Sequence, residues 1–306
     1  MIEFTVDTPK EDIPEADLFL QPRYYALHRT RHDGHYFRLV DGEDTAGAAM
    51  FLAGAEGNFE SPLRGSYGGL WVRPGSRLER IEAFADAILG FFSKKAGAER
   101  LGIVLAPTAY DPVWTSQQYA ILQDRGFRTV RSEVSQHIPV AADSFRQVVR
   151  KEKRRQMNKL ERQGASARLA TSRDYQRLYE LLSLSREGGI PLSMTWGQVS
   201  EMVEAFPDQV LFTETILDGE PIAAAMALIV NPKTMYTLYY GNRSDSDGSP
   251  VLLALACLHE VCRERTFERL DLGASSIDGR ISSAIFGFKE SLGAEPSLKF
   301  WLERAL

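Results

Sequence analysis

The sequence predicts an α/β (α+β) fold built from two tandem modules, each a mixed sheet flanked by helices. The order of short apolar strands and amphipathic helices in the first half recurs in the second half. Corresponding positions keep a nearly constant spacing of about 170 residues, from Glu99 to Glu268 and from Gly126 to Gly293. A chain of 306 residues is long enough for two domains of ordinary size. We therefore expect a first module over residues 1–140 and a second over residues 141–306.

The first module begins with the apolar strand Gly47–Gly54, in the sequence GAAMFLAG. A second strand, Ser66–Val72, leads through a Pro/Gly turn into the amphipathic helix Leu78–Lys95. A third strand begins at Glu99 and is followed by a helix over Ser116–Gly126. Short connections pair strands antiparallel, whereas helical crossovers join parallel strands, so each module is expected to hold a mixed sheet.

The second module repeats this order with clearer turn signals. Asp218-Gly219 is a turn between strands, and Ser249 is expected to cap the helix that follows, with Pro250 at its first position. The expected strands and helices are Gln209–Leu217, Pro221–Val230, Thr234–Gly241, Pro250–Arg265, Glu268–Gly273 and Ser282–Gly293.

A basic helix over residues 143–164 is expected to link the two modules, with Asp143 as its N-cap. Between Arg146 and Arg162 there are eight Lys or Arg residues against two Glu. Three interpretations stay open: a solvated linking helix, capture of phosphate groups from a nucleotide-linked or tRNA substrate, or peripheral contact with an anionic membrane. Because no aromatic residues are interleaved with the basic ones, tRNA is not favoured. Two further helices are expected over Arg173–Leu184 and Trp196–Phe206.

Composition excludes several classes of protein. A hydrophobic fraction of 44% and a charged fraction of 25% are ordinary for a globular chain. The net charge of −5 gives no global attraction to nucleic acid, and no apolar stretch reaches the length of roughly 20 residues that spans a membrane. Met1–Lys10 lacks the pattern of a signal peptide, and Cys257 and Cys262 suit reduced thiols within one helix, so we expect a cytoplasmic protein. The five histidines lack the spacing of metal ligands, and no metal site is predicted.

Several short motifs follow one another in an order that resembles the sequences of the FemAB-like acyltransferases, which have a double-GNAT architecture. The resemblance covers residues 143–306 directly and the first half through the repeat. The motifs are Arg154-Arg155 with Gly164, Asp218–Ala223 (DGEPIA), Leu238–Gly241 (LYYG), Ser249-Pro250 with Leu252-Leu253, Phe267 with Asp271–Gly273, and Phe288-Lys289 with Gly293-Ala294.

The resemblance implies transfer of an acyl or aminoacyl group to an amine. It implies no tightly bound cofactor, an acyl-CoA or aminoacyl-tRNA as co-substrate, and a small molecule or a cell-wall or polysaccharide precursor as acceptor. The glycine-rich signature of the CoA-binding members is not intact, because residues 241–250 read GNRSDSDGSP. The helical-hairpin insertion of several tRNA-using members is also missing from the sequence.

Three residues are predicted to be catalytic. Lys289 matches the lysine of the family's Phe-Lys pair and would stabilise charge on the acyl carbonyl or hold a donor phosphate; the alternative is an exposed helix lysine. Tyr240, near the end of a strand, would donate a proton to the oxyanion or leaving group, unless it only packs against its neighbours. Asp271 would act as base or orient the acceptor, or else bind backbone N–H groups at a strand end.

Further residues are predicted to bind the reactants. A helix N-terminus with nearby donors suits a diphosphate, which makes Arg243, Gly248 and Ser249 the candidates for the donor. The candidates for substrate binding are Tyr239, Phe288, Ser275, Glu214, Arg154 and Arg155.

The predicted function is that of an acyl- or aminoacyl-transferase that forms an amide without a covalent enzyme intermediate, since amide formation from an activated donor needs no enzyme nucleophile. One alternative is a non-catalytic binding module; another is an acyltransferase that acts on polysaccharide or lipid-linked precursors. The first module is degenerate, because Gly102 stands where the second has Asp271, and Asp124-Arg125 stand near the position of Phe288-Lys289. The oligomeric state is not predicted.

Overall fold

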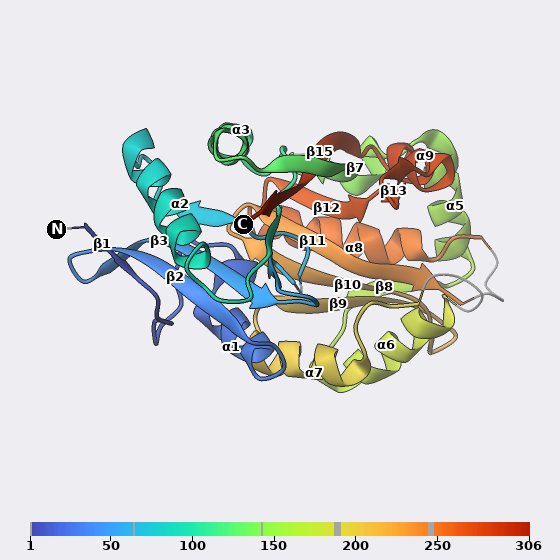
Figure 1. Ribbon diagram of the computed structural model, residues 1–306. Helices are drawn as coiled ribbons and strands as arrows, with labels where there is room; N and C mark the ends of the chain where they lie inside the picture. The colour runs from blue at the N-terminus through green and yellow to red at the C-terminus, as the bar shows by residue number, and fades with distance from the viewer. Residues whose placement is uncertain (1, 64, 142, 187–190, 244–247) are drawn as a thin grey trace. The chain divides into compact units, whose positions relative to one another are not determined.

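The computed structural model describes residues 2–63, 65–141, 143–186, 191–243 and 248–306, which form two units (Figure 1). The first unit comprises Met1–Val134 and Ser297–Leu306, and the second comprises Ser135–Pro296. Strand β7 (Arg128–Pro139) continues from the first unit into the second, and strand β15 (Glu295–Ala305) continues from the second into the first. In each of these two strands, the first residues therefore belong to one unit and the last residues to the other.

The first unit is a mixed sheet with two helices packed on an aromatic core. Its strands lie in the order β1-β2-β3-β4-β6-β15-β7, with β5 paired to β3. All its recorded pairings are antiparallel except that between β4 and β6. The strands are β1 (Ile2–Thr5), β2 (Gly34–Asp41), β3 (Asp44–Ala53), β4 (Asn58–Ser61), β5 (Leu70–Val72) and β6 (Arg100–Val104). The helices are α1 (Pro22–Arg29), α2 (Leu78–Phe92) and α3 (Pro112–Asp124), and side chains of α2 and α3 complete the core.

The second unit repeats this plan. From the Ser135–Pro139 end of β7, its strands lie in the order β7-β12-β11-β10-β9-β8. They are β8 (Ser166–Leu169), β9 (Val210–Leu217), β10 (Glu220–Asn231), β11 (Thr234–Asn242) and β12 (Arg269–Ala274), and β13 (Ser276–Ile277) with β14 (Arg280–Ile281) forms a small hairpin. The helices are α4 (Phe145–Val148), α5 (Lys151–Arg162), α6 (Tyr175–Leu184), α7 (Trp196–Ala205), α8 (Val251–Glu264) and α9 (Ser283–Ser291).

Local sequence explains the connections of the second sheet. Asp218 and Gly219 both have positive φ, 52° and 83°, which is the backbone of a two-residue hairpin turn that pairs β9 and β10 antiparallel. Between β11 and β12 the chain passes through α8, and those strands pair parallel. The predicted mixed sheet flanked by helices is confirmed.

The two faces of this sheet are covered by different helices (Figure 1). Thr213 and Thr215 of β9 donate hydrogen bonds to carbonyls of Ala254 and Pro250, at α8 and its start. Phe212, the residue before Thr213, packs on the ring of Tyr175 in α6. Because successive side chains of a strand point to opposite faces, α8 and α6 lie on opposite sides of the sheet.

The expected linking helix is divided into two in the structure. The N-cap of α4 is Ser144 rather than Asp143, and the backbone N–H of Ser144 donates to Oε1 of Gln147 at 2.7 Å. Val149 and Arg150 are extended, with ψ of 149° and 152°, and the N–H of Arg150 donates to Ser291 O at 2.9 Å. This tertiary hydrogen bond replaces a helical one, so a continuous helix over 143–164 was a wrong prediction. No helix within the described ranges is long and apolar enough to cross a membrane.

Candidate acyl-transfer site

Strand β12 leaves its pairing with β11 directly after Asp271, and its pairing with β7 becomes irregular at the same point. On one side, β11 and β12 pair only from Thr234↔Arg269 to Tyr236↔Asp271, although β11 continues to Asn242. On the other side, the register between β12 and β7 shifts between Asp271↔His137 and Ala274↔Ser135, where the pairing resumes. The backbone groups of the residues between Asp271 and Ala274 lie at this irregularity and need other partners. In a mixed α/β sheet, the carboxyl ends of separating strands are where ligands bind.

The carboxylate of Asp271 holds the separated strand end. Its Oδ1 accepts hydrogen bonds from the N–H of Gly273 at 2.6 Å and from Oγ of Ser135 at 3.2 Å. The side chain is only 1% exposed, and Gly273 has a φ of 79°. Asp271 thus binds backbone at a strand end, as the alternative interpretation of the sequence expected, and its charge lies inside the candidate site.

Lys289 lies buried against the same segment. Ser282 caps α9 through the N–H of Ile285, and the helix directs the Lys289 side chain to the end of β12. The ammonium Nζ donates to the carbonyls of Gly273 and Ala274, each at 2.7 Å, and the residue is 2% exposed. Burial lowers the pKa of Lys289 to about 8, against the opposing effect of the Asp271 carboxylate. The expectation of an exposed helix lysine is excluded.

The ammonium of Lys289 has more N–H donors than the two hydrogen bonds that it makes. An ammonium has three N–H donors, and the two carbonyls take two of them. Within the part of the chain that the structure describes, no carboxylate lies within ion-pair distance of its Nζ. The third N–H donor therefore has no partner among the described residues.

Tyr239 and Tyr240 point to opposite faces of β11. The ring of Tyr240 stacks on Phe288 with centroids 6.4 Å apart, beside Lys289. Burial raises the pKa of Tyr240 and the Asp271 carboxylate adds to this effect, whereas Arg186 opposes it, so the phenol stays protonated at neutral pH. The Tyr239 hydroxyl is already engaged, since it lies 2.7 Å from Oγ of Ser193 and accepts from the N–H of Met194 at 3.0 Å.

Two of the other predicted residues lie deep in the sheet. Ser275 is fully buried at the end of β12 and donates to Oε1 of Gln136 at 2.6 Å. Glu214 is fully buried on β9, which β10 and β11 separate from β12. Its carboxylate pairs with Arg168 at 2.7 Å and with Arg177 at 3.4 Å. The structure thus brings Ser275 to the candidate site and leaves Glu214 away from it.

The basic helix α5 adjoins the site at its first turn. Nζ of Lys153 lies 5.3 Å from the centre of the Phe288 ring, and Arg150 pairs with Glu290 at 2.6 Å. Arg154 and Arg155 are exposed on the outer face of the helix, where they border a shallow depression of about 330 Å³ together with Lys151 and Asn158. Because the apolar face of α5 is buried, these two arginines point away from Lys289.

The candidate diphosphate site at the start of α8 lies partly outside the described residues, since residues 244–247 of the loop are not described. The N-cap of α8 is Pro250, and the helix begins at Val251, one residue later than expected. Ser249 is not the side-chain cap that the sequence predicts; its carbonyl accepts the N–H of Leu252. Gly248 has a φ of 77°, and the N–H of Arg243 donates to Ile222 O.

Sequence reasoning missed the polar residues that β7 contributes. Ser135 and His137 face Asp271 across the sheet, and Gln136 is fully buried against Ser275. They belong to no motif. Their proximity to the site follows from the register of β7 against β12, which the sequence alone does not show.

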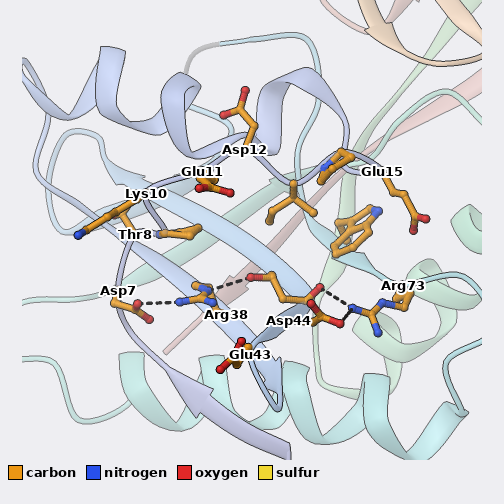
Figure 2. A pocket seen from close by; sticks show the side chains of 15 residues that line it. Asp7, Thr8, Lys10, Glu11, Asp12, Glu15, Arg38, Glu43, Asp44 and Arg73 are labelled. Atoms are coloured by element: carbon orange, nitrogen blue, oxygen red, sulfur yellow. Dashed lines mark hydrogen bonds and ion pairs between the residues drawn. The ribbon is translucent and has the colours of Figure 1, made fainter.

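A second cavity, of about 710 Å³, lies in the first unit (Figure 2). The segment Asp7–Glu15 covers it, and strands β2, β3 and β5 form its base. Figure 2 shows that its arginines are paired internally: Arg38 with Asp7 at 2.9 Å and Arg73 with Asp44 at 3.4 Å. In the same unit Arg125, near the repeat position of Lys289, pairs with Asp86 on the surface at 2.6 Å. Across the described segments, no group of three or more His, Cys, Asp or Glu side chains is arranged to hold a metal ion.

Comparisons with known proteins agree with this geometry. Residues 147–287 match the acetyltransferase (GNAT) domain family. No curated protein sequence matches the chain significantly. Among solved structures, the chain is similar to FemX, with a TM-score of 0.71, 11% identity, and coverage of 96% of this chain and 93% of FemX.

Two further structures share the fold at low identity. One is the C-terminal domain of a putative lysylphosphatidylglycerol synthetase from Agrobacterium fabrum, with a TM-score of 0.57, 12% identity, and coverage of 89% and 84% of the two chains. The other is a tandem GNAT protein from the clavulanic acid biosynthesis pathway, with a TM-score of 0.51, 12% identity, and coverage of 100% and 98%. The predicted resemblance to the FemAB-like, double-GNAT proteins is confirmed, and the acetyltransferase domain confirms the predicted enzyme class, an acyltransferase.

Proposed function

We propose that the second unit transfers an acyl or aminoacyl group directly to an amine, at the point where β11 and β12 separate. The observation that carries the proposal is Lys289, whose ammonium is buried, bound to two backbone carbonyls and free of any carboxylate partner among the described residues. Burying such a charge is costly, and a protein that retains it gains a strong electrostatic group inside a poorly solvated site.

The geometry supports a role for each of three side chains. As the amine attacks, negative charge develops on the acyl oxygen, and the remaining N–H of Lys289 stabilises it. Tyr240 keeps its proton at neutral pH because burial and the Asp271 charge raise its pKa. Its hydroxyl is the proposed proton donor to the leaving group. Asp271 fixes the backbone turn that Lys289 binds.

Direct transfer without a covalent enzyme intermediate is part of the proposal. Burial raises the pKa of Cys257 to about 11 and that of Cys262 to about 12, so both thiols stay protonated at neutral pH. Both residues lie in α8, and Sγ of Cys262 contacts the sulfur of Met235 inside the core. Neither thiol is a nucleophile in this arrangement.

We propose an acyl-CoA as donor, because the matched family is an acetyltransferase domain. Its diphosphate would lie at the start of α8, near Arg243, Gly248 and Ser249. Aminoacyl-tRNA is the alternative donor, which the resemblance to FemX and to a lysylphosphatidylglycerol synthetase domain suggests. The acceptor is an amine on a small molecule or on a cell-wall or polysaccharide precursor in the cytoplasm.

The test uses purified full-length protein with acetyl-CoA and a panel of amines: an amino sugar, a lysine peptide and a diamine. Release of the CoA thiol and the mass of the amide product report transfer. We expect turnover with at least one amine, and a loss of 100-fold or more, about 3 kcal/mol in the barrier, for Lys289→Met, which fills the same volume without the charge. Lys233→Met, at an exposed lysine that pairs with Glu268, is the matched control and should retain activity.

Two outcomes would contradict the proposal. One is a Lys289→Met variant that is folded and keeps more than about one tenth of wild-type activity, which would make Lys289 a purely structural group. The other is a protein that shows neither transfer from acetyl-CoA or aminoacyl-tRNA nor saturable binding of CoA, which would favour a binding module. Binding is measured as a rise in Tm, because a ligand at 100 times its Kd stabilises a protein by about 2.7 kcal/mol.

A further inference from the structure

The outer face of helix α5 carries a continuous row of basic side chains. Residues three, four and seven positions apart lie on the same face of a helix, and the opposite face of α5 buries Met157 and Leu160. The exposed row, here called the basic stripe, consists of Lys151, Arg154, Arg155, Asn158 and Arg162. It is about 16 Å long, because a helix rises 1.5 Å per residue.

The charges of the basic stripe are not neutralised by the protein. Just before the stripe, Arg146 pairs with Glu161 and Arg150 pairs with Glu290, so these two arginines hold the segment in place. Across the described ranges, by contrast, no carboxylate lies within ion-pair distance of the four basic residues of the stripe. Their charges therefore remain available to a partner outside the chain.

A helix that only faces water does not account for this arrangement. Like charges three or four residues apart repel each other, and solvated helices usually alternate the sign of their charges. Lys151 has Arg154 and Arg155 at these spacings, and Glu161 is already paired with Arg146. The stripe therefore opposes the stability of its own helix, and an anionic partner would relieve the repulsion.

The surface around the stripe suits a broad anionic partner better than RNA. Its two depressions are shallow, with volumes of about 330 and 500 Å³, and they share Asn158. Proteins that bind unpaired RNA stack its bases on aromatic side chains, but no Phe, Tyr or Trp in the described part of the chain is exposed. The stripe is also short for duplex RNA, since double-stranded-RNA modules span roughly 16 base pairs.

We propose that the basic stripe of α5 docks the second unit on an anionic lipid surface. Anionic headgroups attract Lys and Arg residues that lie within a Debye length of them, and four such residues give weak, reversible binding. The inference goes beyond the proposed acyl transfer and does not depend on it, because docking needs neither donor nor acceptor.

Docking through the stripe would bring the candidate site close to the lipid headgroups. The start of α5 is joined to α9, the helix of Lys289, by the hydrogen bond from Arg150 N–H to Ser291 O at 2.9 Å. Lys153 contacts the Phe288 ring of α9 from the side of α5 opposite to the stripe. The thickness of one helix, about 10 Å, would therefore separate the headgroups from α9. An amine carried on a lipid would be concentrated near the site.

Co-sedimentation of the full-length protein with lipid vesicles tests the docking. The vesicles contain either equal parts of phosphatidylglycerol and phosphatidylcholine or phosphatidylcholine alone, and no acyl donor or amine is added. We expect binding only to the anionic vesicles. The binding should be lost when the ionic strength rises from about 0.1 M to about 1 M, because the Debye length falls from about 10 Å to about 3 Å.

Charge reversal on the stripe tests whether this face makes the contact. The variant has three substitutions: Lys151→Glu, Arg154→Glu and Arg155→Glu. It should bind anionic vesicles at least 100-fold more weakly, since each basic residue near the surface contributes about fivefold. The matched control makes the same change of charge at exposed positions of the first unit: Arg77→Glu, Lys94→Glu and Arg128→Glu. This control should bind like the wild type.

Thermal melts establish that both triple variants are folded. If the stripe variant with three Glu residues does not fold, substitution of the same three positions by Gln removes the charges without reversing them. The Gln variant should still bind anionic vesicles at least tenfold more weakly than the wild type.

Three results would overturn the inference. The first is a wild type that does not bind anionic vesicles at low salt. The second is an equal loss of binding in the stripe variant and the control, which would make the attraction non-specific. The third is salt-dependent binding to tRNA, lost in the stripe variant, without binding to vesicles. None of these results bears on acyl transfer, which is measured with soluble amines, and a failure of acyl transfer would leave the vesicle result unaffected.

Discussion

Lys289 and Asp271 bind the two polar backbone groups of a single residue, Gly273. The Lys289 ammonium donates to its carbonyl at 2.7 Å, and the Asp271 carboxylate accepts its N–H at 2.6 Å. At Gly273, β12 no longer pairs with β11 and its register against β7 is shifted. Two opposite charges thus replace the lost ladder hydrogen bonds, and the turn they fix becomes part of the candidate site.

Gly273→Ala should weaken both stability and activity. The φ of 79° strains any L-residue, and an added Cβ would lie 3.4 Å from the Tyr236 ring. We expect a loss of about 1–2 kcal/mol in the free energy of unfolding and at least a tenfold loss in kcat. Gly219→Ala, at a turn with a φ of 83° and open space around it, is the control. It should lose comparable stability in denaturant titrations and retain transfer; equal activity of both variants would refute the role of the Gly273 turn.

The buried ammonium of Lys289 should make the free energy of unfolding depend on pH in the alkaline range. Its pKa is about 8 in the folded chain and near 10.5 in the unfolded chain, so between these values the unfolded state binds more protons. Stability of the wild type relative to Lys289→Met should therefore rise with pH across this window, by up to about 3 kcal/mol. Urea titrations of both proteins at pH 7 and pH 10 measure the difference. A pH-independent difference would mean that the ammonium is solvated.

The variant Tyr240→Phe tests the role of the Tyr240 hydroxyl independently of the role of its ring. The variant keeps the stack on Phe288 and removes the proposed proton donor. We expect kcat to fall by roughly 10- to 100-fold with little change in KM and in Tm. Tyr239→Phe, on the other face, loses the hydrogen bonds to Ser193 and Met194 and should cost about 1 kcal/mol of stability instead. If Tyr239→Phe instead lowers kcat in steady-state kinetics while Tyr240→Phe lowers only Tm in thermal melts, the proton donor would be Tyr239.

His259 should make the protein sensitive to acid. It is fully buried, both ring nitrogens lack a hydrogen-bond partner among the described residues, and burial lowers its pKa to about 4. The unfolded imidazole has a pKa near 6.5, so stability is complete above that value and falls as the pH drops toward 4, by up to about 3 kcal/mol. His259→Leu should abolish this part of the loss and be at least as stable at neutral pH. Thermal melts between pH 4.5 and 7.5 test this; a variant with the unchanged acid profile would contradict it.

The architecture of the second unit was predictable from local sequence, because its turns and strands are specified by near neighbours. Asp218-Gly219 predicts the hairpin that the structure contains, and the apolar runs on either side become β9 and β10. The division of the linking helix was not predictable. It depends on the hydrogen bond from Arg150 to Ser291, a partner distant in the sequence.

The candidate site was predictable only in part. The Phe-Lys motif indicated Lys289, and Asp271 was predicted because it is a carboxylate within the strand Glu268–Gly273. Glu214 was also predicted to bind substrate, but the order of strands places it beside Arg168 and Arg177 instead. Ser135 carried no signal, since it reaches the Asp271 carboxylate only through the pairing of β7 with β12.

The sequence by itself determined the repeated mixed-sheet module and the residue types available for acyl transfer, because hydrophobic periodicity and turn chemistry act over short distances. Only the tertiary structure decided which of those residues meet. It buried Lys289, lowered the pKa of its ammonium, and placed Asp271 at the backbone turn that Lys289 binds, beside Ser135 of β7. Burial and strand register join residues more than 100 positions apart, and the free energy of a desolvated charge depends on that assembled environment rather than on its neighbours in the chain.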